Sequence, residues 1–225
     1  PAGIVTATAE CKDGKCERVS LDMIPPFVDA LDQTVTTEEW GEVTFDIAFG
    51  GVFYAVVAVE QLGISITPEH TADLVRAGMA MKAAANAAYD VQHPEIPSID
   101  HIAYAIFVER LDANTIRTCC TLWPGRVDRS PCGTGSSAIS AVLHKRGELA
   151  VGEEMTTVSI IGSRFRVSLT GETEVDGKTA VLPNVSGRCW TYGMSQLALD
   201  PDDPFRDGFA LPDAWGPEAM HIKWE

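Results

Sequence analysis

Long apolar runs are missing from this sequence of 225 residues. No stretch approaches the roughly 20 consecutive apolar residues that a membrane-spanning helix requires. We therefore predict that the protein does not cross a membrane. Its apolar content of 45% is nevertheless ample for the core of one large domain or two small ones.

Basic residues are also scarce, with 17 Lys and Arg against 32 Asp and Glu and a formal net charge of −15. A field of this sign repels nucleic-acid phosphates and anionic membrane surfaces, so we expect neither as a partner. A small zwitterionic substrate in a closed pocket remains compatible with this charge, because local hydrogen-bond donors decide such binding.

Patterns of metal and cofactor sites are absent as well. Cys11 and Cys16 bracket an Asp-Gly turn and could face each other across a hairpin, as free thiols, a disulfide or half a zinc site. No second pair of Cys or His follows at metal-ligand spacing, so free thiols are favoured. Cys119 and Cys120 lie in an expected strand, one on each face, as packing residues. No nucleotide motif or Schiff-base lysine motif is present, and we predict no metal and no cofactor.

The most informative stretch is Asp-Arg-Ser-Pro-Cys-Gly-Thr-Gly-Ser-Ser-Ala at residues 128–138. Pro131 ends any earlier helix, Gly133 permits a tight turn, and the small residues that follow open a new helix. Cys132 is therefore expected at a helix N-terminus. The positive end of the helix dipole favours its thiolate, and the N–H groups of Gly133 and Thr134 can hold a carboxylate or phosphate. The alternative is a buried structural cysteine after a Gly-rich turn.

This stretch resembles the second-cysteine signature of the proline racemase and hydroxyproline epimerase family. Further segments resemble that family in its usual order: Trp-Gly-Glu-Val-Thr-Phe-Asp-Ile-Ala-Phe-Gly-Gly-Val-Phe-Tyr-Ala at 40–55, Gln-Leu-Gly-Ile at 61–64, His-Pro-Glu-Ile-Pro at 93–97, and Asp-Asp-Pro-Phe at 202–205 with Gly-Phe at 208–209. The family's earlier motif, which supplies a first catalytic cysteine or serine, is not found. We therefore expect the chain to be a C-terminal portion of a longer protein.

The resemblance implies an α+β fold of the diaminopimelate epimerase type, with two pseudo-symmetric half-domains whose strands wrap around a central helix. Residues 1–26 would complete the first half-domain. Residues 27–193 would form the second, which carries Cys132, and residues 194–225 would return to the first. The same resemblance implies that Phe49 and Phe53 help to wall a small pocket.

The implied activity is that of a cofactor-independent amino-acid racemase or epimerase, an isomerase that inverts Cα of 4-hydroxyproline or, next, proline. Two thiols on opposite faces of the substrate exchange the roles of base and acid, and Cys132 is expected to be one of them. Asp128 would hold the ring ammonium, or else cap the following turn. The N–H groups of Gly133 and Thr134 would hold the carboxylate, and His101 would contact a hydroxylated substrate.

Other functions remain open at this point. The first is dehydration of 3-hydroxyproline on the same scaffold, although such dehydratases generally carry threonine in place of Cys132. The others are a non-catalytic amino-acid-binding remnant and a thiol-redox protein, which would need a resolving cysteine beside Cys132. The choice among proline, 4-hydroxyproline and 3-hydroxyproline stays open. Relatives suggest a homodimer, and free thiols suggest the cytoplasm.

Local patterns predict the remaining elements. A hairpin is expected over residues 4–19, and two strands over 42–59 with a bend at Gly50-Gly51 where the backbone approaches something closely. A helix is expected over 67–91, and a strand with His101 near its start over 99–108. A strand is expected over 115–122, followed after the Cys132 helix by antiparallel strands at 155–162, 164–169 and 179–185.

Overall fold

The computed structural model describes residues 4–208, and the chain divides into units of residues 1–189 and 190–225. All of its described helices and strands belong to the first unit, while residues 190–208 form only turns and irregular backbone. Phe209 of the family-like Gly-Phe pair, and most of the predicted 194–225 segment, lie outside the described residues.

The first unit is built on a sheet that closes on itself. Its strand order is β1-β2-β11-β10-β9-β7-β6-β5-β4-β3, with β8 paired to β7. Ala180 in β11 also pairs with Phe27 in β3, which completes a ring of strands. The bounds are β1 Thr6–Lys12, β2 Lys15–Asp22, β3 Phe27–Thr37, β4 Gly41–Phe49, β5 Phe53–Ala58, β6 Ile102–Arg110, β7 Thr115–Leu122, β8 Arg126–Val127, β9 Glu154–Ser159, β10 Arg164–Val175 and β11 Lys178–Gly187.

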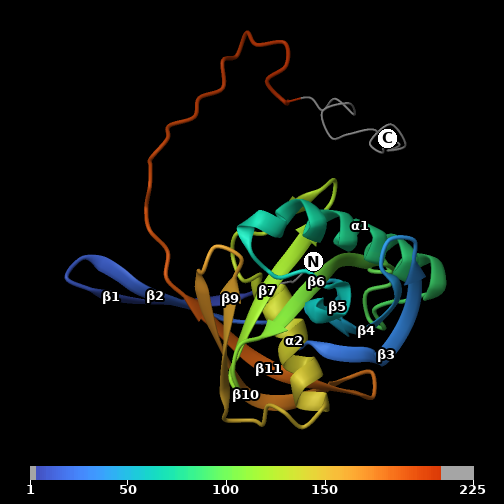
Figure 1. Ribbon diagram of the computed structural model, residues 1–225. Coiled ribbons are helices and arrows are strands. Elements are labelled where there is room, and N and C mark those ends of the chain that lie inside the picture. Colours follow the sequence, from blue (N-terminus) through green and yellow to red (C-terminus); the bar gives the residue numbers. More distant parts are fainter. Residues whose placement is uncertain (1–3, 209–225) are drawn as a thin grey trace. The chain divides into compact units, whose positions relative to one another are not determined.

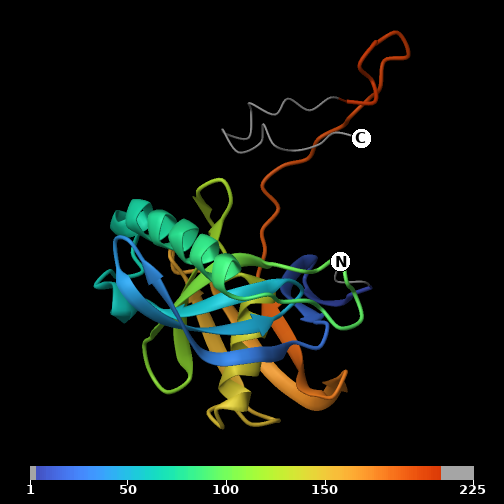
Figure 2. The same cartoon turned by 90° about the vertical axis from the view of Figure 1, so that its right-hand side faces the viewer.

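Two helices occupy opposite sides of this sheet (Figures 1 and 2). Helix α1, Thr71–Ala88, connects the parallel strands β5 and β6 and covers the outside of the sheet. Helix α2, Gly133–Lys145, connects the parallel strands β7 and β9 and is enclosed by the ring. The short 3-10 helices η1 and η2 span Val59–Leu62 and Pro68–His70.

Six strands, β4, β5, β6, β7, β10 and β11, contribute to two separate cores because successive side chains point to opposite faces. The outer core, beneath α1, contains Phe107 and Cys119 together with Leu74 of the helix. The inner core, around α2, contains Ile106 and Cys120. The prediction that Cys119 and Cys120 pack on opposite faces is therefore confirmed, and both are almost fully buried.

Most of the predicted elements are present. The first hairpin turns at Asp13-Gly14 and pairs Cys11 with Cys16 as free thiols. The strand at 115–122 has the predicted bounds, and β9, β10 and β11 pair antiparallel as expected. The helix predicted over 67–91 is shorter, since η2 precedes it and it ends at Ala88.

Two expectations need correction. The strand predicted over 99–108 begins at Ile102, so His101 lies in the preceding loop and not in the strand. Strand β3 was not predicted at all. Its pairing with β4 is interrupted by irregularities between Val28 and Gln33, which break the alternation by which a strand is recognised.

Candidate active site

Cys132 occupies the N-cap position of α2, as predicted, and is 7% exposed. Its φ of 65° lies in the left-handed region, which non-glycine residues rarely adopt and which concentrates at functional sites. The surrounding turn is held by hydrogen bonds. The Cys132 N–H donates to Ser130 Oγ at 3.1 Å, and Thr118 Oγ1 donates to the carbonyl of Pro131 at 3.0 Å.

The sulfur of Cys132 lies among polar side chains inside the ring. Its distance to the Tyr54 hydroxyl is 3.6 Å and to Thr134 Oγ1 3.9 Å, while these two oxygens are 2.7 Å apart. A hydrogen bond from the Cys120 thiol, followed by those from Tyr54 and the Gly135 N–H, lowers the pKa of Cys132 to about 7 against the opposing effect of burial. A substantial fraction of Cys132 is therefore thiolate near neutral pH.

The two side chains that donate to this sulfur keep their own protons. Burial raises the pKa of Tyr54 far above that of an exposed tyrosine. The hydrogen bond of Cys120 to Cys132, together with burial, raises the pKa of Cys120 well above its ordinary value. Both groups are thus neutral donors at the pH at which Cys132 ionises.

The turn between β4 and β5 packs directly on the first turn of α2. A Cβ atom added at Gly50 would lie 2.1 Å from the carbonyl oxygen of Thr134 and 2.9 Å from the N atom of Ala138. The predicted close approach of backbone at Gly50-Gly51 is therefore confirmed, and what it approaches is the helix that carries Cys132. A Cβ atom added at Gly135 would lie 2.5 Å from Ile106 Cδ1 and 3.0 Å from the Cys132 sulfur, so this position of α2 also leaves little room for a side chain.

Asp128 lies in the loop that leads to Cys132. Its Oδ1 accepts a hydrogen bond of 2.9 Å from the N–H of Ser130, and its own N–H donates to the carbonyl of Cys120. The aspartate therefore caps the turn that follows it. Its negative charge also acts to raise the pKa of Cys132.

His101 is not in contact with Cys132. It is exposed, and its Nδ1 lies 3.1 Å from Asp100 Oδ1. Together with Tyr104, it lines an open hollow of about 450 Å³ beside the start of β6. The Tyr104 ring lies 5.8 Å from that of Tyr54, so aromatic side chains link the hollow to the cysteine.

The pocket role expected for Phe49 and Phe53 is wrong. Both are at most 1% exposed, and they pack in the outer core. The Phe49 ring lies 5.2 Å from that of Phe27 and 4.5 Å from that of His93, which is itself buried. The face of the strand that points to Cys132 instead carries Tyr54.

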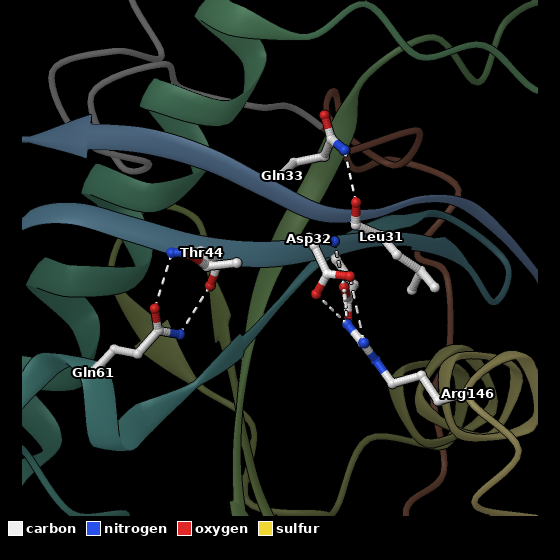
Figure 3. A network of polar contacts seen from close by, with 7 residues as sticks. Leu31, Asp32, Gln33, Thr44, Gln61 and Arg146 are labelled. Atoms are coloured by element: carbon white, nitrogen blue, oxygen red, sulfur yellow. Dashed lines mark hydrogen bonds and ion pairs between the residues drawn. The ribbon is translucent and has the colours of Figure 1, made fainter.

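The C-terminal end of α2 is fixed by charge (Figure 3). Arg146 Nη2 lies 2.7 Å from Asp32 Oδ1 and 2.7 Å from Asp46 Oδ1, and Asp46 also accepts from the Asp32 N–H. Burial raises the pKa of Asp46 in spite of the arginine. These ion pairs join the helix to β3 and β4 and border a cavity of about 340 Å³.

Two further kinds of site can be assessed within residues 4–208. No three His, Cys, Asp or Glu side chains in this range converge as ligands for a metal ion. Neither of the helices described there is sufficiently long and apolar to cross a membrane.

A family model described as proline racemase matches residues 1–210. The chain belongs to the proline racemase family. The resemblance inferred from the Cys132 motif is thus confirmed.

Members of the proline racemase family with high identity include the 4-hydroxyproline 2-epimerase of Agrobacterium fabrum and the 4-hydroxyproline 2-epimerase 1 of Rhizobium rhizogenes. Each is 53% identical to this chain, and the match covers 98% of this chain. The chain spans 64% of the length of both relatives.

Solved structures agree with this assignment. A hydroxyproline epimerase from Agrobacterium vitis, with bound trans-4-OH-L-proline, matches 99% of this chain and 64% of its own with a TM-score of 0.88 and 51% identity. A probable proline racemase from Agrobacterium radiobacter K84, with bound carbonate, covers 98% of this chain and 65% of its own at a TM-score of 0.86 and 52% identity. Methylitaconate-delta-isomerase shares the fold alone, at 12% identity and a TM-score of 0.50 over 83% of this chain and 61% of its own. The predicted α+β fold class of the diaminopimelate epimerase type is confirmed.

Proposed function

We propose that the protein is a cofactor-independent epimerase that inverts Cα of a proline-type amino acid, with 4-hydroxyproline favoured and proline next. The observation that carries the proposal is Cys132, a buried thiol of lowered pKa at the N-terminus of an enclosed helix. Relatives of 51–53% identity that are named 4-hydroxyproline 2-epimerase support the choice of substrate.

The chemistry assigned to Cys132 is proton transfer at Cα. The Cα proton of an amino acid is very weakly acidic, so its removal needs a base held at short range and stabilisation of the charge that develops. As a thiolate, Cys132 removes this proton, and as a thiol it returns one in the opposite direction of the reaction. A pKa of about 7 suits both tasks, because the thiol and the thiolate are then both populated near neutral pH.

The residues around Cys132 supply the charges that a zwitterionic amino acid requires. The N–H groups of Gly133 and Thr134 are assigned to the substrate carboxylate, because they lie in the first turn of α2, where N–H groups have no partner within the helix. The carboxylate of Asp128 is assigned to the ring ammonium. Its Oδ1 is used by the turn it caps, and within residues 4–208 no hydrogen bond to its Oδ2 is found. His101, at the hollow beside Tyr104, is assigned to the hydroxyl group of the substrate.

A second acid/base group is needed on the opposite face of the substrate. We assign it to a facing half-domain, with residues 1–26 completing that half, residues 27–193 forming the half that carries Cys132, and residues 194–225 returning to the first. The closed ring of strands around α2 supports the middle assignment, because it encloses one central helix as such a half-domain would.

We assign the protein to the cytoplasm as a homodimer. The six cysteines are all free thiols, two of them exposed, which suits a reducing compartment. Sedimentation of the full-length protein tests the dimer.

The proposed activity is tested by proton NMR in D2O of the full-length protein with trans-4-hydroxy-L-proline, L-proline and trans-3-hydroxy-L-proline. Loss of the α-proton signal and appearance of the epimer is expected for 4-hydroxyproline. Cys132→Ser should abolish both, whereas Cys11→Ser, which alters an exposed thiol of the first hairpin, should change neither. A pyrroline product would reassign the protein as a dehydratase. Absence of exchange with all three compounds would refute the proposal.

A further inference from the structure

Besides the Cys120 thiol, two hydroxyl side chains, those of Tyr54 and Thr134, lie close to the Cys132 sulfur and to each other. The Tyr54 hydroxyl is 2.7 Å from Thr134 Oγ1 and 3.6 Å from the sulfur, and Thr134 Oγ1 is 3.9 Å from the sulfur. Either partner can be the donor in each of these contacts. Hydroxyl and thiol groups carry one proton and accepting lone pairs, so the hydrogen bonds of this group can run in either direction.

Epimerisation requires Cys132 to exist in two protonation states in the same place. When Cys132 begins a conversion as a thiolate, it takes up the Cα proton and ends as a thiol. In the reverse conversion it begins as a thiol and ends as a thiolate. A buried thiolate is costly without donors, and a buried hydroxyl is costly without an acceptor. A site with donors fixed in one direction would favour one state at the expense of the other.

Building on the proposed epimerase activity, we propose that Tyr54 is a positioning residue that forms, with Thr134, a reversible hydrogen-bond relay for Cys132. When Cys132 is a thiolate, Thr134 donates to the Tyr54 oxygen and Tyr54 donates to the sulfur. When Cys132 has taken the Cα proton, its thiol donates to Tyr54 and Tyr54 donates to Thr134. The hydroxyl protons only rotate, so both oxygens stay neutral and no heavy atom has to move.

The position of Tyr54 in the fold suits this role. Its side chain is 1% exposed, so water cannot replace its hydrogen bond. Its backbone is fixed in β5, opposite Ala48 of β4 on one side and Tyr104 of β6 on the other. Burial also raises the pKa of Tyr54, which therefore remains a donor throughout the range in which Cys132 titrates. Thr134 is held in the first turn of α2, next to the cysteine.

The relay is tested by titrating the Cys132 thiol directly. Iodoacetamide reacts with the thiolate, so the alkylation rate of the Cys132 peptide, followed by mass spectrometry, should rise with pH through the pKa of Cys132. In the full-length protein, Tyr54→Phe should raise this midpoint by about one pH unit, which corresponds to roughly tenfold slower alkylation below both midpoints. Incorporation of 3-fluorotyrosine at position 54, a stronger donor of nearly the same shape, should lower the midpoint.

The matched control is Tyr104→Phe, which removes a hydroxyl from the ring that packs against Tyr54. This variant should leave the midpoint of Cys132 unchanged. An unchanged midpoint in folded Tyr54→Phe, or a midpoint that fluorotyrosine does not lower, would overturn the relay. Because alkylation needs no substrate, this result is independent of whether hydroxyproline is epimerised. The experiment therefore separates failure of the relay from failure of the proposed epimerase activity.

Discussion

The contact between Gly50 and α2 makes a steric prediction about catalysis. Cβ atoms essentially never lie within 3.0 Å of another non-bonded heavy atom, whereas one at Gly50 would lie 2.1 Å from the carbonyl oxygen of Thr134. Gly50→Ala therefore requires the β4–β5 turn and the first turn of α2 to separate by about 1 Å, since both partners are backbone. The first turn of α2 adjoins Cys132 and carries the N–H groups assigned to the substrate carboxylate. A misplacement of about 1 Å costs on the order of 100-fold in rate.

The same strain should lower the free energy of unfolding by about 1–3 kcal/mol, the usual cost of overpacking. The assays are kcat/KM for trans-4-hydroxy-L-proline and urea unfolding of the full-length protein. Gly171→Ala is the matched control, because a Cβ at Gly171 would meet only the flexible side chain of Leu182, at 3.3 Å. A folded Gly50→Ala variant with kcat/KM close to that of Gly171→Ala would refute the reasoning.

Two further predictions concern stability. Arg146→Met should lower the free energy of unfolding by about 1–3 kcal/mol at neutral pH, because it leaves the buried carboxylate of Asp46 uncompensated. Burial already raises the folded-state pKa of Asp46, so protonation of this carboxylate should relieve the penalty as the pH falls. Urea unfolding measured as a function of pH checks both points. Arg76→Met, at an exposed arginine, is the control. Asn86→Ala should raise the unfolding rate and lower the urea midpoint, because the Asn86 amide bonds both the N–H and the carbonyl of Ile102, which starts β6; an unchanged midpoint would contradict this role.

Local sequence signals were sufficient for much of the fold. Asp13-Gly14 specifies a hairpin turn, and the Pro-Cys-Gly-Thr-Gly run specifies a helix start, because both depend on backbone preferences of adjacent residues. The Gly50-Gly51 pair likewise indicated a close backbone contact. Its partner, α2, could not be deduced, since the contact depends on how the strands close around that helix.

The surroundings of Cys132 could be predicted only in part. Gly133 and Thr134 adjoin it in the sequence, whereas Tyr54 and Cys120 reach it from β5 and β7. For both Tyr54 and Cys120, the available signal was the alternation of side chains between the two faces of each strand. If Tyr54 had been assigned to the inner face, its neighbour Phe53 would have been assigned to the outer face, where Phe53 in fact packs beneath α1. Pattern alone does not say which face of a doubly buried strand meets the helix that carries Cys132.

The closure of the ring by β11 against β3 also bears on the order in which the protein folds during synthesis. The ribosome delivers the N-terminus first, so α2 emerges before β9, β10 and β11 exist. Until the last of these strands pairs with β3, the apolar surface of α2 has only part of its cover. The nascent chain therefore exposes part of this apolar surface in the interval between the release of α2 and the release of β11.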